Sequence, residues 1–171
     1  MHKNSQAALE FLTTYAWAFL VIIIMVGALA YFGVLSPSKL LPDRCNFGSE
    51  VGCNKDFMVV KDADTGTLTM RVENNFGTAV TIPIGGVTIT TDIQGITACT
   101  EKIDTTDTTT TAYTWDSDKT VSLTADCTNA AASLVPKEKV KFQIEIKYFP
   151  VAAGATYTKF VYGEVFTTIQ T

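Results

Sequence analysis

The sequence predicts an α+β protein, in which a long N-terminal hydrophobic α-helix is followed by a mostly antiparallel, β-sandwich-like globular domain. Two observations carry this prediction. The 28 residues 11–38 contain no charged side chain, although 18% of the 171 residues are charged. After residue 40, apolar and polar residues alternate in several segments with the period of two that half-buried strands have. The chain is long enough for one domain and such an appendage.

The hydrophobic helix is expected over residues 6–36, after a short polar head at 1–5. Alanine, leucine, isoleucine, methionine and phenylalanine dominate this segment, and no proline precedes Pro37. Because Pro37 disfavours helical geometry at Ser36, we expect the helix to end there. Residues 37–44 contain two prolines and are expected to form a linker to the β domain at 45–171.

The apolar segment can span a membrane, because about 20 apolar residues cross a bilayer core of ~30 Å. It is longer than the ~7–15-residue core of a secretory signal, and no A-x-A-like cleavage site follows it. We therefore expect the segment to stay in the mature protein. His2 and Lys3 precede it and a long acidic domain follows, which favours an N-terminus inside the cell and an extracellular domain.

Two long strands are the clearest elements of the β domain. Residues 139–148, "KVKFQIEIKY", alternate without a fault, and residues 156–169 form a second such segment with a β-bulge expected at Gly163. About six to eight strands are expected in all, at the spacing typical of a sandwich or a related two-layer fold. The other segments with strand character are 57–74, 78–91 and 119–127.

The segment 57–74 contains "DADTG", which has two interpretations. Asp62, Asp64 and Gly66 are similar to the start of a calcium loop, and Glu73 stands at its twelfth place. A hairpin with its turn near 64–66 is the better interpretation, because Gly66 at the fifth place offers no side-chain ligand and Asp and Gly favour turns. We expect no metal site in the chain.

The four cysteines, Cys45, Cys53, Cys99 and Cys127, all follow the apolar segment. Three pairings are possible, and we favour Cys45–Cys53 with Cys99–Cys127 because each pair flanks a local loop. Zinc is disfavoured, because the cysteines are not closely paired and His2 is the only histidine. The expected extracellular placement also favours disulfides.

Threonine is concentrated in residues 100–114, where eight of the fifteen residues are Thr. Such a segment is typical of a solvated loop or an edge strand. A sharper interpretation is O-glycosylation of the exposed hydroxyls, and no N-x-S/T sequon supports N-glycosylation. The candidate acceptors are Thr105, Thr106, Thr108, Thr109, Thr110 and Thr111.

Composition and motifs disfavour nucleic-acid binding and catalysis. The net charge of −4 and the absence of basic runs give no electrostatic footprint for phosphates. No G-x-S-x-G or H-E-x-x-H motif is present, and the only histidine, His2, is expected on the cytoplasmic side in the removed head, so no second histidine is left for a catalytic triad. We therefore expect a protein that is not an enzyme and that needs no cofactor.

Glu10 stands at the start of the apolar segment, where a carboxylate is expensive in hydrocarbon. One explanation is a helix N-terminus, where an acid gains about 0.3–1 kcal/mol from the macrodipole. A second explanation starts from the short head "MHKNS". If the chain were cut after Ser5, Gln6 would be the new first residue, and Glu10 would lie about one helical turn from its amine.

The N-terminal region resembles the type IV pilin family, in particular the archaeal pilins with class III signal peptides. Ser5, Gln6, Glu10 and the apolar helix after them carry the resemblance, with "QAALEFLTTYAWA" similar to the archaeal version. It covers roughly the first 35 residues. In that family a prepilin peptidase removes the leader, here residues 1–5, by cutting between Ser5 and Gln6. Gly commonly precedes the cut in the family, whereas this chain has the small residue Ser5.

The resemblance implies a homo-oligomeric helical filament at the cell surface, with functions in adhesion and surface attachment. The precursor would lie in the cytoplasmic membrane, and an assembly ATPase and a membrane platform protein would build the pilus. In the filament core, the Gln6 amine of one subunit would pair with Glu10 of a neighbour and set the axial register. The helix residues expected to pack in that core are Phe11, Leu12, Leu20, Ile22, Ile23, Ile24 and Leu29.

Two alternatives remain open from the sequence. Tyr15 and Trp17 are either membrane-interface anchors of the precursor or packing residues between helices. The whole protein is either a pilin or a single-pass, signal-anchored envelope protein whose β domain binds a ligand such as a sugar. An archaellin is less favoured, because the region after the cut does not match the usual archaellin pattern.

Overall fold

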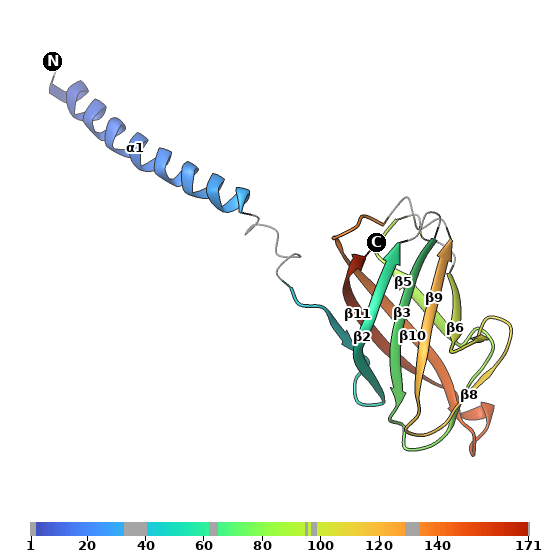
Figure 1. Cartoon of the computed structure of the whole chain (residues 1–171). Helices are drawn as coiled ribbons and strands as arrows, with labels where there is room; N and C mark the ends of the chain where they lie inside the picture. The colour runs from blue at the N-terminus through green and yellow to red at the C-terminus, as the bar shows by residue number, and fades with distance from the viewer. Residues whose placement is uncertain are drawn as a thin grey trace. The chain divides into compact units, whose positions relative to one another are not determined.

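The computed structural model describes residues 3–32, 41–61, 65–94, 96, 99–128 and 134–170. The chain divides into two compact units, Met1–Leu41 and Pro42–Thr171, which are described separately. The described part of the first unit is formed by the helix α1 (Lys3–Tyr31), and the second unit is rich in strands (Figure 1). The α+β class predicted from the sequence is therefore confirmed.

Helix α1 begins earlier and ends earlier than the expected 6–36. It starts at Lys3 and ends at Tyr31, where the N–H of Phe32 closes the last turn on the carbonyl of Ala28 at 3.0 Å. Alanine, leucine and methionine in the apolar segment have high helix propensity, whereas the β-branched run at residues 21–24 has a lower one, so the helix does not rest on propensity alone. Residues 33–36, and 37–40 of the expected linker, lie outside the described residues.

The described residues of the β unit form eleven strands, more than the six to eight expected. Strands of two or three residues are too short to show a periodic pattern, so sequence analysis missed them. The elements are β1 (Arg44–Asn46), β2 (Val51–Lys61), β3 (Thr65–Asn74), β4 (Val80–Ile82), β5 (Val87–Thr91), β6 (Cys99–Ile103), β7 (Thr106–Asp107), β8 (Tyr113–Trp115), β9 (Thr120–Thr128), β10 (Lys139–Pro150), the 3-10 helix η1 (Ala155–Tyr157) and β11 (Lys159–Gln170).

The strands form one connected, barrel-like sheet rather than the two separate sheets of a sandwich. Its order is β7-β6-β9-β3-β2-β11-β10-β4-β8, with β5 added to β10 and β1 added to β11. The parallel pairing of β11 with β2, through Ile169 and Val59, joins what would otherwise be two layers (Figure 1). The expectation of a sandwich is corrected in this respect, because two residues at the end of β11 continue the sheet around the core.

The pairing register of β10 and β11 confirms the two long strands that were expected, but not the β-bulge expected at Gly163. In β10 the side chains of Val140, Phe142, Ile144, Ile146 and Tyr148 are buried, as the alternation predicted. β11 begins at Lys159 rather than at 156, because η1 occupies the preceding turn. β10 and β11 pair without interruption through Ile144 and Gly163, so the bulge expected at Gly163 is wrong.

Gly163 has a packing role instead. A Cβ atom at this position would overlap the ring of Phe47, which is buried against the strand. We expect Gly163→Ala to lower the free energy of unfolding by about 1–3 kcal/mol, the usual cost of overpacking. Urea unfolding would measure it, with the same substitution in a Phe47→Leu background as control. An equal cost in both backgrounds would contradict the contact as its cause.

The hairpin expected over 57–74 is confirmed by the antiparallel pairing of β2 with β3. The pairing runs from Val51 with Asn74 to Lys61 with Gly66, and its register shifts between Cys53 and Phe57. Residues 62–64, which connect the strands, lie outside the described residues. Glu73 lies in β3 opposite Gly52, at the other end of the strand from the turn, which favours the hairpin interpretation over the calcium loop.

The barrel is incomplete between β5 and β6, where a buried carboxyl group lies. Within the described residues, β5 pairs only with β10 and β6 only with β7 and β9. The side chain of Glu101 in β6 is buried, and its carboxylate accepts a hydrogen bond from the backbone N–H of Ile89 in β5. Burial raises the pKa of Glu101, although the backbone hydrogen bonds act in the opposite direction.

The raised pKa of Glu101 gives a pH-dependent contribution to stability. The carboxyl group of Glu101 binds its proton more readily in the folded state than in the unfolded state. It therefore stabilises the fold less as the pH rises above 4.5, the ordinary pKa of a glutamate. The Glu101→Gln variant keeps an acceptor for the N–H of Ile89 but carries no charge. We therefore expect the difference in free energy of unfolding between variant and wild type to shift in favour of the variant when the pH is raised from 4 to 7. Urea midpoints at the two pH values would measure it. A variant that loses stability relative to the wild type over this interval would contradict the assignment.

Candidate functional site

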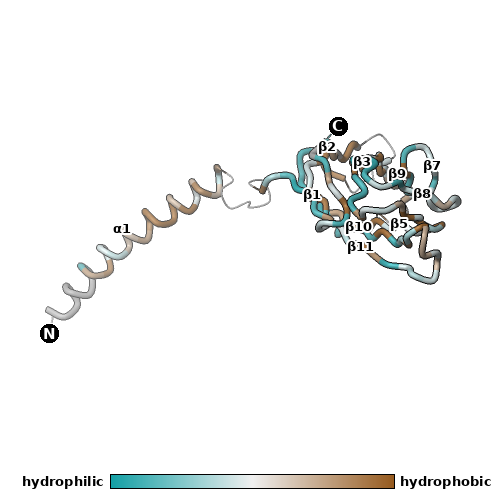
Figure 2. Tube along the Cα trace, turned by 90° about the horizontal axis from the view of Figure 1, so that it is seen from below, coloured by the Kyte–Doolittle hydropathy of each residue, from teal (hydrophilic) through white to brown (hydrophobic). Residues whose placement is uncertain are grey.

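The candidate functional site is the apolar surface of α1. All seven side chains expected to pack in an assembly are exposed in the single chain, from 46% exposed for Leu20 and Leu29 to 66% for Leu12. Figure 2 shows apolar residues along successive turns of the helix. A helix that is apolar all round is normally buried in lipid or in protein, so this surface needs a covering partner. The other four expected residues are Phe11, Ile22, Ile23 and Ile24.

The same helix has the properties of a membrane anchor or a signal segment. Glu10–Tyr31 contains 22 residues with a mean hydropathy of 2.2 over its most apolar window. At a rise of about 1.5 Å per residue this length matches a bilayer core of ~30 Å. Tyr15 and Trp17 are exposed on it, and the ring centroids of Phe11 and Tyr15 are 4.2 Å apart. Both interpretations of these two aromatic residues therefore stay open.

Glu10 lies inside the helix and not at its start. Because α1 begins at Lys3, Glu10 lies beyond the first turn, where the effect of the macrodipole has faded. The helix N-terminus therefore does not explain the carboxylate in the uncut chain. The backbone carbonyl of Glu10 accepts hydrogen bonds from the hydroxyl groups of Thr13 at 3.0 Å and Thr14 at 2.9 Å. These bonds satisfy the hydroxyl groups of both threonines on the backbone of the helix itself.

Ser5 and Gln6 both lie within α1, although their side chains are outside the described part of the helix. Gln6 and Glu10 are four residues apart, a spacing that puts two residues on the same helix face. A cut between Ser5 and Gln6 would therefore create an amine on the face that carries Glu10. The helical backbone therefore places these two predicted residues at positions of one helix face.

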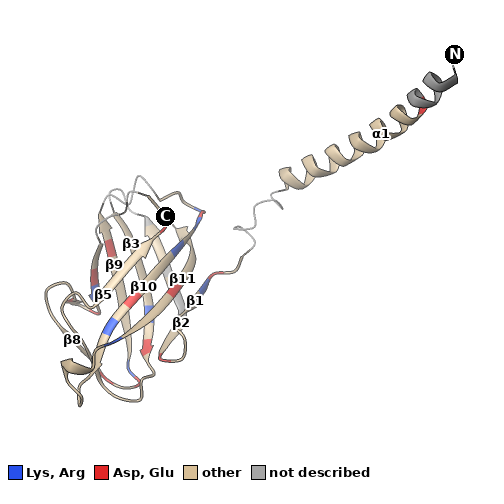
Figure 3. Ribbon diagram, turned by 180° about the vertical axis from the view of Figure 1, so that it is seen from behind, with Lys and Arg blue, Asp and Glu red and all other residues tan. Residues whose placement is uncertain are grey.

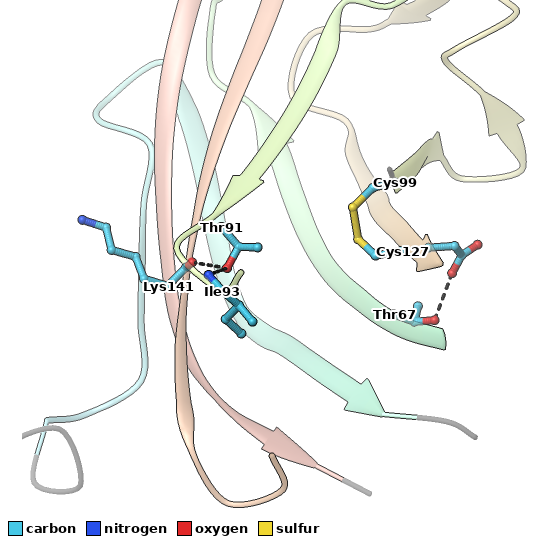
Figure 4. The surroundings of a disulfide bond; sticks show 7 residues. Thr67, Thr91, Ile93, Cys99, Cys127 and Lys141 are labelled. Carbon is cyan, nitrogen blue, oxygen red and sulfur yellow. Dashed lines mark hydrogen bonds between the residues drawn. A yellow bond between two sulfur atoms is a disulfide. The ribbon is translucent and has the colours of Figure 1, made fainter. Parts of the chain in front are cut away.

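The two disulfides pair as favoured from the sequence, Cys45 with Cys53 and Cys99 with Cys127. Cys99 and Cys127 are direct partners across the β6–β9 ladder, beside the hydrogen bond from Thr67 to Asp126 (Figure 4). The pKa of Asp126 is lowered, chiefly by its hydrogen bond from Lys102. Disulfides form in oxidising environments, so the β unit has the properties of an extracellular domain.

The first residues of the β unit are fixed to three different strands, which sequence analysis did not foresee. Asp43 accepts a hydrogen bond of 2.8 Å from Lys139 in β10, and Arg44 donates one of 2.6 Å to Glu164 in β11. Cys45 is bonded to β2 through its disulfide. Any pull on the chain at this end would therefore be shared among several strands. Such long-range partners leave no local signal in a single sequence.

The threonine-rich segment forms β7 and the turns around it, and its hydroxyl groups differ in access. Thr105 and Thr111 are exposed. Thr109 is also exposed, but its hydroxyl donates a hydrogen bond to Asp107 at 2.6 Å. Thr108 is only 1% exposed, and its hydroxyl donates to the carbonyl of Glu101. Thr108 is therefore removed from the candidate O-glycosylation sites, whereas Thr105, Thr106, Thr109, Thr110 and Thr111 remain predictions.

Comparison with known proteins adds no family assignment. No family model matches the chain, and no curated protein matches it significantly. The fold and the site together define a class: a protein with one N-terminal apolar helix and a disulfide-bonded, strand-rich unit. The function must be argued from the helix and its polar residues.

Proposed function

We propose that this chain is a structural subunit of a surface filament related to the archaeal type IV pili. The observation that carries the proposal is the apolar surface of α1, exposed all round and preceded by Ser5, Gln6 and Glu10 at the spacing of the pilin family. The β unit has its own core and two disulfides, so it does not need the helix to cover it. The helix is therefore available to pack against copies of itself.

The energy of assembly would come from covering apolar side chains. Each large apolar side chain gains about 1.5–3 kcal/mol when it moves from water to an apolar environment. Leu20, Ile22 and Ile24 belong to a run of such residues, so packing of several helices would make a very stable core. Adhesion and surface attachment are the functions that such filaments commonly serve.

Glu10 would give this packing one register. In an apolar core, an unpaired carboxylate or amine costs several kcal/mol, so each seeks the other. The amine of Gln6 after cleavage and Glu10 of a neighbouring subunit would satisfy both charges at one axial offset. The prepilin peptidase, the assembly ATPase and the platform protein are the partners that this function needs.

A second candidate function is a signal-anchored envelope protein with a ligand-binding β unit. The length of the apolar span favours it, because the same 22 residues that could pack in a fibre also match a bilayer. The two candidate functions differ in the final location of α1, which is the core of a filament in the first and the lipid bilayer in the second.

Electron cryomicroscopy of material sheared from cells tests the proposal. A pilin should appear in helical filaments with α1 helices at the axis and β units at the surface. An anchored protein should instead stay in the membrane pellet and be released only by detergent, which would exclude the filament.

A further inference from the structure

A groove on the outer face of β5, β10 and β11 contains a carboxylate, Glu145, that forms no ion pair within the described residues. Its volume is about 410 Å³, within the range of ~300–1,000 Å³ typical of small-ligand sites. Asn46, the last residue of β1, and Gly48, in the turn that follows, form part of its wall. Among the described residues that line it, Tyr162 is the one aromatic side chain, and 67% of this residue is exposed.

Strand register places the polar side chains of the groove in two rows. In the first row, Thr88 of β5, Glu145 of β10 and Tyr162 of β11 are direct neighbours. In the second row, Thr90, Gln143 and Glu164 are neighbours in the same way. Side chains directly opposite on adjacent strands lie about 4.5–5.5 Å apart at Cβ. The two rows are two residues apart along each strand, about 6.6 Å at a rise of ~3.3 Å per residue, so one sugar-sized molecule can contact both rows.

The two carboxylates of the groove are in different states. Glu164 is held by Arg44 at 2.6 Å and Lys141 at 2.8 Å, and these hydrogen bonds lower its pKa. Glu145 has no ion pair within the described residues, and neither Gln143 nor Tyr162 has a side-chain hydrogen bond there. Within the described residues, the groove therefore offers the carboxylate of Glu145, the amide of Gln143 and the hydroxyl group of the exposed Tyr162 ring.

The surrounding charges favour a neutral ligand. Lys147 follows Glu145 on the same face of β10, so a cation at Glu145 would meet a like charge there, whereas Lys141 on the other side is paired with Glu164. An anion would meet the unpaired carboxylate of Glu145. Figure 3 shows charged residues of both signs along β10 and β11.

We propose that this groove binds a neutral saccharide. A sugar ring has an apolar C–H face that can pack on the Tyr162 ring, which presents an apolar body and a polar tip. Its hydroxyl groups can donate to Glu145, in the stronger hydrogen bonds that charged acceptors make, and exchange hydrogen bonds with Gln143 and Thr88. The inference goes beyond the proposed function, since the β unit carries the groove whether α1 packs in a fibre or spans a membrane.

Saturation-transfer NMR on the full chain, in a detergent without sugar groups, tests the inference. The probes are maltose, cellobiose, lactose and chitobiose. At least one of them should receive saturation, most strongly at the C–H protons of one ring face. Tyr162→Ala should weaken its binding at least about tenfold, and Tyr162→Phe should keep it within about threefold. Glu145→Gln should weaken it several-fold.

Phe160→Ala is the matched control, because Phe160 is an exposed aromatic residue of the same strand that does not line the groove. It should leave saccharide binding unchanged. The inference is overturned if no probe binds at concentrations of about 20 mM, above the Kd of even a weak millimolar site. It is also overturned if the Tyr162→Ala variant binds the saccharide like the wild type. A third contradicting result would be that a lysine-rich peptide binds through Glu145 while none of the saccharides does, because the groove would then recognise a cation. None of these results depends on filament formation.

Discussion

Replacement of Glu10 by alanine is expected to reduce the chain recovered in surface filaments at least about a hundredfold. In the proposed core, the variant leaves the amine of Gln6 buried without its partner, and breaking a buried pair in this way costs about 3–5 kcal/mol per contact. The precursor should still accumulate in the membrane, since alanine makes the apolar helix easier to insert. Quantitative immunoblots of the sheared and membrane fractions would measure both amounts.

Controls separate the charge of Glu10 from its size. Glu10→Gln keeps the volume and removes the charge, so it should fail nearly as completely as Glu10→Ala. Met25→Leu changes an exposed apolar residue of the same helix at nearly constant volume and should assemble normally. Filaments of normal amount and helical symmetry from either Glu10 variant would show that the pair does not set the register.

Removal of the disulfides is expected to give the largest loss of stability in the β unit. In the chain-entropy treatment, the bond between Cys99 and Cys127, with a separation of 28 residues, contributes about 3.6 kcal/mol. The bond between Cys45 and Cys53, with a separation of 8 residues, contributes about 2.5 kcal/mol. The variant with both Cys99 and Cys127 replaced by Ala should therefore unfold at the lowest urea concentration. The variant with both Cys45 and Cys53 replaced by Ala should unfold at a concentration between that and the wild type.

Trp115 provides the signal for this measurement, because it is buried in the core and donates a hydrogen bond to the carbonyl of Lys119 at 2.8 Å. Trp17 is the only other tryptophan, so all variants would carry Trp17→Phe to remove its fluorescence. The Trp17→Phe chain with both disulfides intact is the reference. Unchanged midpoints in both Ala pairs would mean that the disulfides do not limit the unfolded chain as expected.

The strands that could be predicted were those whose pattern is local and long. Residues 139–148 alternate because one face of β10 covers the core and the other is wet, and ten residues give that period clearly. The cysteine pairs were predictable for a similar reason, since each pair encloses a short stretch of chain. Helix α1 was predictable from its unbroken apolar composition, with its ends displaced by a few residues.

The features that could not be predicted depend on contacts between distant residues. The pairing of Ile169 with Val59 turns the expected sandwich into a barrel-like sheet, and nothing local marks it. Gly163 suggested a bulge, whereas the ring of Phe47, more than a hundred positions earlier, is what excludes a side chain there. Thr108 looked like its neighbours, and only the closeness of β6 shows that its hydroxyl is buried.

Tyr162 could have been found from the sequence, because it alternates with buried Val161 and Val165 in β11 and so faces outward. Its neighbours in the groove could not, since the register of β5 and β10 is needed to bring Thr88 and Glu145 beside it. Charge partners behave in the same way. Arg44 and Glu164 are 120 positions apart, and only the fold joins them.

The mass of the chain at the cell surface tests the central proposal most directly. Intact-mass spectrometry of sheared material, with N-terminal sequencing, shows whether the peptide bond between Ser5 and Gln6 has been cut. This cut distinguishes a processed pilin from an anchored protein. A chain that begins at Gln6 would place the new amine one helical turn from Glu10, as the pilin proposal predicts. A chain that keeps residues 1–5 in the surface fraction would contradict both the cut after Ser5 and the register that depends on it.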